Sequence, residues 1–324
     1  MKNYVGKSSH CVSCKHNIYT NIFNEHEWRN INTKVLKQIK MTLNSEGFWN
    51  GDYETWDAIV AVCNLETMVT FGVDMDERWQ VKKSYGVLYE IGLKEVVAYL
   101  RTKISKRGQY YYFGEDNWDL FRLVLVIKKM NLESYFYEYK ALQKYCLELC
   151  SNSSLTELDN QWSGPAILAL AFELCVLCQK TKLKENIYRK IISLRNDDGS
   201  WGDPQNDALC IWHTSQVLNV ISLEQKELEK SINSIFRHLQ SEGFKKDSYL
   251  KDYYTAHALG AIYKSGYVDN PTFIEIYEDL KSRLSNGNIK DRGGLSMIGT
   301  VLSRIFTDTG RIIDIIIKEG ELQS

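Results

Sequence analysis

The chain has 324 residues, of which 44% are hydrophobic and 12% aromatic, and it contains only 3 prolines. This composition can bury a large core and excludes an intrinsically disordered chain, while the scarcity of proline favours helices. The 40 basic and 41 acidic residues give a formal net charge of −1, so no global positive charge attracts nucleic acid. The length allows one large domain or two smaller ones.

The start of the chain, MKNYVGKSSHCVSCKHNIY, lacks the apolar run of a signal peptide. The longest apolar stretch, from Ile167 to Cys178, contains Glu173 and is too short to cross a bilayer. We expect a cytoplasmic protein without a transmembrane segment, and peripheral contact with a membrane stays open. Eight cysteines are too few for a disulfide framework, so those in apolar helical stretches are expected to be reduced core residues. These are Cys63, Cys146, Cys150, Cys175, Cys178 and Cys210.

Loops rich in glycine and aromatic residues recur along the chain. Their glycines are separated by 61, 91, 44 and 50 residues, and 91 is close to two periods of about 45. Each loop lies between a run with helical spacing and a more apolar run, which predicts a repeat of two helices. The loops are SEGFWNGDYETWD (45–57), RGQYYYFGEDNWD (107–119), NDDGSWGDPQND (196–207), SEGFKKDSYLKD (241–252) and KDRGG (290–294).

Six helical pairs are predicted, each with a more polar first helix and a more apolar second helix. Asp57, Asp119, Ser163 and Asp207 are expected to cap helix starts, and Pro165 suits a first helical turn. The pattern predicts an all-α fold, an (α/α)6 toroid in which second helices form an inner ring and first helices an outer ring. An open solenoid would use the same units. The pairs run roughly over 33–67, 92–130, 134–179, 182–220, 225–264 and 272–305, with a last helix near 311–318.

The DGSWGD loop (198–203), followed by the apolar run DALCIWHTSQVLNVI, resembles repeats of the terpenoid cyclase and protein prenyltransferase superfamily, which includes squalene-hopene cyclases. The resemblance covers nearly all of 33–305 and implies a toroid with a central, largely apolar cavity. We expect one toroid domain over 33–324, preceded by an N-terminal segment, 1–32. The resemblance implies a terpenoid cyclase-like or prenyltransferase-like enzyme, a lyase, isomerase or transferase, acting on a small isoprenoid or other apolar substrate.

Candidate acids lie at the predicted starts of two inner helices. Members of the superfamily that begin by protonation use Asp-x-Asp-Asp there, because a neutral carboxylic acid can protonate an alkene. The nearest sequences are DNWD (116–119), with tryptophan at the middle aspartate, and ETWD (54–57). We expect Asp116 and Asp119 to act as acid or base with support from Asp57; helix capping is the alternative. The aromatic residues expected to line or rim the cavity are Trp56, Trp118, Trp162, Trp212, Tyr112 and Tyr254.

Metal chemistry is a second hypothesis. Terpene synthases that begin by ionisation hold magnesium through Asp-Asp-x-x-Asp, and the sequence has no such run. The zinc prenyltransferases use an aspartate and a cysteine on one inner helix and a histidine on the next. Asp207, Cys210 and His257 match these residue types with different spacing, and His213 lies one turn after Cys210. This set predicts a zinc-dependent transferase or hydrolase; packing in the core is the alternative.

The N-terminal segment carries a further potential metal site. Cys11 and Cys14 form a Cys-x-x-Cys pair and His16 follows closely, so they could share a structural zinc ion if a second pair of ligands joined them. A redox-active or incidental thiol pair is the alternative. Two other functions stay open for the toroid: sugar cleavage by Asp57 and Asp119 across an aromatic cleft, and non-catalytic binding of a peptide or lipid.

Overall fold

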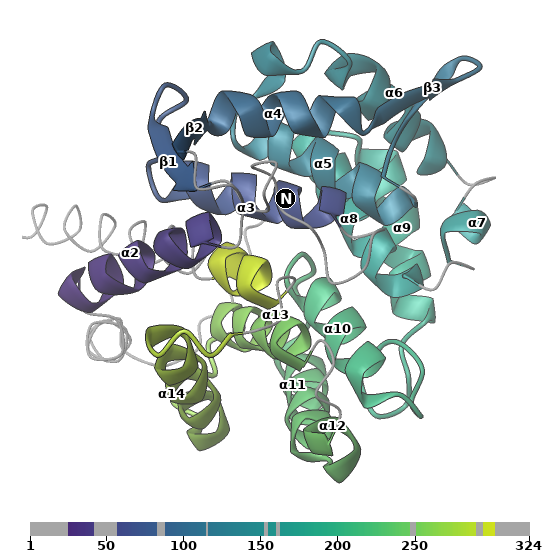
Figure 1. The fold of residues 1–324 in the computed structure, drawn as a ribbon. Coiled ribbons are helices and arrows are strands. Elements are labelled where there is room, and N and C mark those ends of the chain that lie inside the picture. Colours follow the sequence, from purple (N-terminus) through teal and green to yellow (C-terminus); the bar gives the residue numbers. More distant parts are fainter. Residues whose placement is uncertain are drawn as a thin grey trace, which may run out of the picture.

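The structure is a computed structural model, and it describes residues 25–41, 57–82, 88–114, 116–151, 155–159, 163–246, 251–289 and 294–301. Most of these residues are helical, as the sequence predicted, and the strands are few and short (Figure 1). None of the helices in the described ranges combines the length and the apolar run that a membrane crossing requires. The two cysteines and the histidine of the proposed N-terminal metal site, Cys11, Cys14 and His16, lie outside the described residues.

The long helices differ in how they are buried. One set is buried on almost every side, and we call these the inner helices; the other set buries one face, and we call these the outer helices. The two kinds alternate along the chain, in the order that the hydropathy pattern predicted. The inner helices are α3 (Asp57–Thr70), α5 (Asn117–Lys129), α8 (Gly164–Leu177), α10 (Asp207–Leu218) and α13 (Lys251–Lys264), and helical residues 294–301 are buried in the same way. The outer helices are α2 (Glu25–Met41), α4 (Leu93–Thr102), α6 (Tyr139–Leu149), α9 (Thr181–Ser193), α11 (Gln225–Gln240) and α14 (Pro271–Ser285).

Consecutive inner helices pack against one another: α3 on α5, α5 on α8, α8 on α10, and α10 on α13. Each of the five inner helices from α3 to α13 also contacts the next outer helix along the chain. In Figure 1 the inner helices follow one another around the middle of the molecule, with the outer helices farther out. Two short helices, α7 (Leu155–Asp159) and α12 (Glu242–Lys246), lie in connections.

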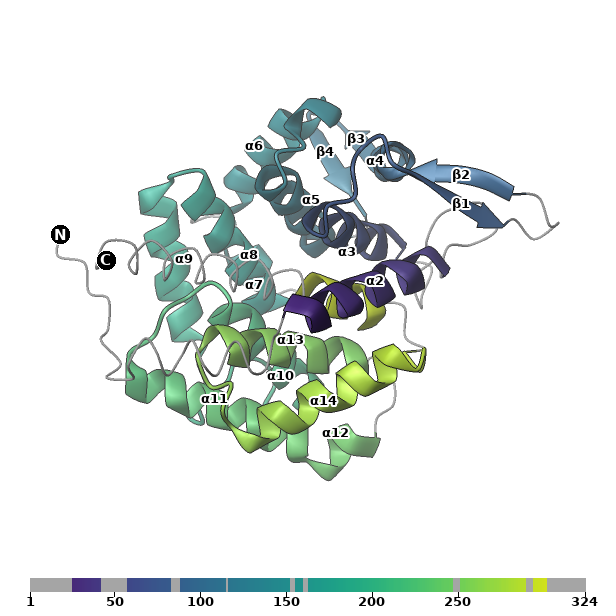
Figure 2. The ribbon, with the colours of Figure 1, turned by 90° about the vertical axis from the view of Figure 1, so that its left-hand side faces the viewer.

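The first and last outer helices of the described chain meet. Helix α14 contacts α2, and Figure 2 shows the two side by side. The side chains of Lys34 and Gln38 in α2 donate hydrogen bonds to Ser285 Oγ (3.1 Å) and the Leu284 carbonyl (2.5 Å). On the inner side, Thr300 Oγ1 lies 3.4 Å from the Cys63 carbonyl of α3. Helix α2 begins before the predicted domain boundary at residue 33.

Two β-hairpins interrupt the helices and were not predicted. Strands β1 (Arg78–Lys82) and β2 (Leu88–Gly92) pair antiparallel, with Arg78 opposite Gly92. Strands β3 (Ile104–Arg107) and β4 (Tyr110–Phe113) pair with Arg107 opposite Tyr110. The second hairpin occupies a stretch that was predicted to be a loop. Its consecutive tyrosines favour a strand, and the two-residue connection Gly108-Gln109 is typical of a hairpin.

Two of the predicted helix caps were wrong by a few residues. Asp116, not Asp119, is the N-cap of α5, and its side chain accepts a hydrogen bond from Asp119 N at 3.0 Å. Likewise Asn206, not Asp207, caps α10 through Leu209 N at 3.1 Å. The predicted aspartates lie within the first turns instead, where a negative charge is favourable beside the helix dipole.

Candidate functional site

Charged and polar side chains converge from several inner helices in the interior of the protein. Most are more than nine-tenths buried, although core helices usually present apolar side chains there. From the sequence, Asp119 and His257 were predicted to be functional and Cys63 to be a core cysteine. The other residues have no recognisable spacing. We call this group the interior polar cluster; it comprises Cys63 and Glu66 of α3, Asp119 and Arg122 of α5, Gln216 of α10, and Tyr253 and His257 of α13.

A buried ion pair lies in this cluster. The Arg122 guanidinium donates to the Glu66 carboxylate, and their side chains are 4% and 2% exposed. Burial alone would lower the pKa of Arg122, but the negative charge of Glu66 raises it above its usual range, so the arginine is charged. Arg122 Nε is buried without a hydrogen-bond partner among the described residues, so the pair keeps one unused donor. Removing one partner of an ion pair this deep would leave an uncompensated buried charge.

Two protonated donors flank the ion pair. Burial raises the pKa of Tyr253 well above its usual range; the positive charge of Arg122 acts to lower it and the Asp119 carboxyl acts to raise it. Burial also raises the pKa of the Cys63 thiol, which bonds to Arg122. Both groups therefore hold their protons at neutral pH. Three inner helices thus place proton donors, a cation and carboxylates within reach of one another.

Asp119 enters the cluster from the first turn of α5. Its side chain is buried, with 6% of the residue exposed. The chain can pass this carboxylate because residue 114 is glycine: Gly114 has φ 65°, and a Cβ atom there would collide with Asp119 Oδ2. Of the two acids in DNWD, Asp116 serves as the helix cap and Asp119 faces the interior. Asp57, at the start of α3, is partly exposed.

The predicted aromatic residues separate into two groups. Trp118 of α5 and Trp212 of α10 are buried and meet edge to face, with ring centroids 5.0 Å apart. Tyr254 packs edge to face on Tyr253 at 5.4 Å. Tyr112 instead lies on β4, 5.3 Å from the Tyr145 ring of outer helix α6 (Tyr139–Leu149), rather than on the rim of an interior cavity. Trp56 and Trp162, also predicted at the rim, lie outside the described residues.

The proposed zinc ligands do not assemble into one site. Asp207 Oδ1 accepts a hydrogen bond from His238 at 2.6 Å, and the Cys210 thiol donates to the Asp203 carbonyl at 3.0 Å. His257 Nδ1 accepts from the Gln216 amide at 2.7 Å. His213 lies beside Trp212, with ring centroids 4.9 Å apart. Within the described part of the chain, no three histidine, cysteine or acidic side chains are grouped to hold a metal ion, whether zinc or magnesium.

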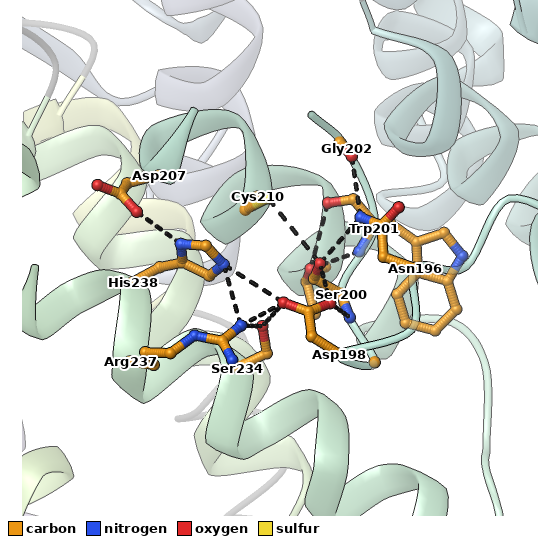
Figure 3. A network of polar contacts seen from close by, with 12 residues as sticks. Asn196, Asp198, Ser200, Trp201, Gly202, Asp207, Cys210, Ser234, Arg237 and His238 are labelled. Carbon is orange, nitrogen blue, oxygen red and sulfur yellow. Dashed lines mark hydrogen bonds and ion pairs between the residues drawn. The ribbon is translucent and has the colours of Figure 1, made fainter. Parts of the chain in front are cut away.

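The DGSWGD loop forms a second polar network, which we call the loop network (Figure 3). Asp198 accepts hydrogen bonds from Ser200 Oγ (2.6 Å) and Ser234 Oγ (3.1 Å) and pairs with Arg237, while His238 lies between it and Asp207. Burial alone would raise the pKa of Asp198, but these hydrogen bonds, first those from Ser200, hold it well below its usual range. The loop network thereby fixes the loop to α11.

The tryptophan of the same loop joins it to two other helices. Trp201 is fully buried; its indole N–H donates to the Ile191 carbonyl of α9 at 2.7 Å, and its backbone N–H donates to Thr214 Oγ1 of α10 at 3.0 Å. Gly199 is required beside it, because φ is 88° and a Cβ atom would lie 2.9 Å from Lys230 Cγ. The DGSWGD motif, on which the family resemblance rests, therefore has a structural role: it joins α9, α10 and α11.

No protein-family model matches this chain, and comparisons with curated proteins and with solved structures also give no match. The function must therefore be inferred from the chemistry of the interior polar cluster.

Proposed function

We propose that this chain is an enzyme of the α/α toroid class that carries out acid–base chemistry on an isoprenoid or another apolar substrate between its inner helices. The alternation of inner and outer helices supports a closed ring, and so do the contacts between its ends. Helix α2 bonds to the end of α14 through Lys34 and Gln38, and Thr300 lies against α3.

The observation that carries the proposal is the buried Asp119 carboxyl, which directly follows the buried Trp118 and interacts electrostatically with the phenol of Tyr253. A carboxyl group removed from water is suited to hold or donate a proton. The edge-to-face pair of Trp118 and Trp212 offers π faces that can stabilise a positively charged intermediate. These features favour proton-initiated chemistry on a carbon skeleton.

The other residues of the site have supporting roles in this proposal. Arg122 and Glu66 act as positioning residues. Their ion pair orients the side chains of the interior polar cluster and adds no net charge to it. Asp116 holds the start of α5 and thereby the position of Asp119. Asp57 begins the neighbouring inner helix and is a secondary candidate for acid–base work. No metal-dependent step is required for proton transfer from a carboxyl group.

The test is turnover of a panel of isoprenyl diphosphates and linear polyenes, each with magnesium, zinc or chelator, followed by mass spectrometry. We expect a cyclised, isomerised or hydrated product with the unmodified chain. Asp119→Asn should lower the rate at least about 100-fold, as expected for loss of a general acid. Asp197→Asn, an exposed aspartate in the DGSWGD loop region, is the matched control and should leave the rate unchanged.

Two results would overturn the proposal. Equal rates for Asp119→Asn and the unmodified chain would remove Asp119 as the acid. A folded protein that leaves every member of the panel unconverted would remove the isoprenoid substrate class.

A further inference from the structure

The end of α4 and the β3–β4 hairpin form a stretch of chain with positive charge only. Residues 96–114 contain four basic side chains and no acidic one, although the whole chain has a formal net charge of −1. Figure 1 shows the hairpin reaching outward after α4, and strand β4 packs on α6. This part of the surface is therefore locally basic on a nearly neutral protein. The four basic residues are Arg101, Lys103, Lys106 and Arg107.

Three of these four cations are available to an anion from outside. Lys103, Lys106 and Arg107 are exposed, and none of them forms an ion pair with any residue in the part of the chain that the structure describes. Arg101 differs, because it pairs with Glu138 at 3.4 Å. Three positive charges near one hairpin thus have no carboxylate to balance them.

Each of the four cations also lies over the ring of a tyrosine. All four distances fall within the range of a cation–π contact. We call these eight residues the hairpin surface. The distances from cation to ring centroid are 3.5 Å for Arg101 and Tyr137, 5.1 Å for Lys103 and Tyr99, 5.6 Å for Lys106 and Tyr111, and 5.2 Å for Arg107 and Tyr112.

The rings are positioned by the fold and keep exposed surface. Tyr110 stacks on Tyr145 of α6 with centroids 4.6 Å apart, and Tyr112 meets the same ring edge to face at 5.3 Å, so the hairpin is fixed on α6. Tyr137 is 79% exposed, and its contact with Arg101 orients it. An exposed and oriented ring is suited to stack on a planar group of a ligand.

The chemistry of this surface selects among anionic ligands. Single-stranded nucleic acid offers both features that the surface matches, because its phosphates pair with lysine and arginine and its unpaired bases stack on aromatic rings. A duplex keeps its bases stacked on one another and offers mainly the charge. A membrane anchor inserts apolar side chains, and the turn of this hairpin, Arg107-Gly108-Gln109, has none.

We propose that the hairpin surface binds single-stranded nucleic acid, with Lys103, Lys106 and Arg107 on phosphates and tyrosine rings on bases. Neither kind of contact reads a base edge, so binding does not depend on sequence. It depends on salt, because each phosphate contact releases a counterion. With three such contacts, the association constant should fall about 20-fold between 50 and 200 mM salt. This inference is independent of the proposed enzymatic activity.

The test is fluorescence anisotropy of labelled oligo-dT and oligo-U of about 16 nucleotides, titrated with the full chain at 50 and 200 mM salt. We expect both to bind with this salt dependence, and a duplex of the same length to bind more weakly. The double variant Lys106→Gln, Arg107→Gln removes two of the three phosphate contacts. It should weaken binding at 50 mM salt by about 10-fold or more and reduce the effect of salt to about 3-fold.

Tyr137→Ala tests the contribution of the rings. Loss of one stacked base should weaken binding about 5-fold or more and leave the salt dependence unchanged. Tyr188→Ala, at an exposed tyrosine of α9, is the matched control. Lys182→Gln, Lys226→Gln removes two exposed lysines from α9 and α11 and is the control for charge. Neither control should change the affinity, and circular dichroism checks that all variants fold.

Several results would overturn the inference. It fails if neither oligonucleotide binds at 50 mM salt, if the duplex binds as tightly as the single strands, or if the hairpin variants bind as tightly as their controls. It also fails if poly-glutamate displaces the oligonucleotide equally well per charge, since the rings would then contribute nothing. Binding to phosphatidylserine vesicles without binding to oligonucleotides would identify a membrane contact instead.

Discussion

The loop network and the interior polar cluster are both built from charged and hydrogen-bonding side chains, yet they differ in origin. The loop network draws its main residues, from Asp198 to His238, from one short stretch of chain, and its carboxylates have several donors each. The interior polar cluster joins residues from Cys63 to His257, and Arg122 Nε has no hydrogen-bond partner among the residues that the structure describes. The DGSWGD motif therefore stabilises the fold, while most groups of the interior polar cluster, Asp119 of DNWD apart, lie where the sequence has no recognisable motif.

The largest expected effect is the loss of stability when one partner of the buried ion pair in the interior polar cluster is removed. Glu66→Leu leaves the buried Arg122 charge without its partner, so we expect the free energy of unfolding to fall by about 3–5 kcal/mol in a urea titration. The double variant Glu66→Leu, Arg122→Met removes both charges and should recover most of that loss. If the double variant lost as much free energy of unfolding as the Glu66→Leu and Arg122→Met variants added together, the two side chains would not be energetically coupled.

A smaller loss of stability is expected when the contacts of the DGSWGD loop with its neighbouring helices are weakened. Trp201→Phe removes the indole N–H bond to the Ile191 carbonyl and part of a fully buried ring, which should cost about 2 kcal/mol. Thermal unfolding measures this loss. Trp79→Phe is the matched control, because the Trp79 indole bonds to an exposed Glu77 side chain, and its melting temperature should hardly change. Equal losses in both variants would contradict a fastening role for Trp201.

The two acids of DNWD should differ in role: Asp116 is expected to stabilise the fold through its capping hydrogen bond, whereas Asp119 is the proposed acid. Asp116→Ala removes the N-cap of α5 and should lower the free energy of unfolding by about 1 kcal/mol. Asp116→Asn keeps a capping oxygen and should remain close to the unmodified protein. Urea unfolding of the two variants provides the comparison. If both lost the same stability, the Asp116 charge would matter more than its capping bond.

The smallest expected effect is a pH dependence of the loop network. The folded-state pKa of Asp198 lies below the unfolded value of about 3.9, so its stabilising contribution is complete above about pH 5 and is lost as pH falls towards the folded-state pKa. For a partly exposed group this contribution is on the order of 0.5–1 kcal/mol. The melting-temperature difference between the unmodified chain and Asp198→Asn should therefore shrink from pH 6 to pH 2. A constant difference over that range would show that the Asp198 charge does not contribute.

The sequence alone determined the helical organisation of this protein. Alternating polar and apolar runs located the two helices of each pair, because burial on one face or on all sides leaves a local record in the chain. Gly199 and Trp201 made the DGSWGD loop recognisable in the sequence, although the groups that they contact, on Lys230, Ile191 and Thr214, belong to other helices. Cys146, Cys150 and Cys175 were correctly expected to be buried.

Only the tertiary structure decided which side chains meet. An inner helix is buried all round, so its sequence has no polar face that fixes its rotation, and nothing local indicated that Glu66 would pair with Arg122 across 56 residues of chain. The expected zinc ligands lie apart for the same reason, since residue types alone do not specify in which direction a side chain points from its helix. The β3–β4 hairpin was also missed, because glycine and tyrosine mark loops and strands alike. Local periodicity defines helices, whereas the site depends on how those helices are rotated against each other.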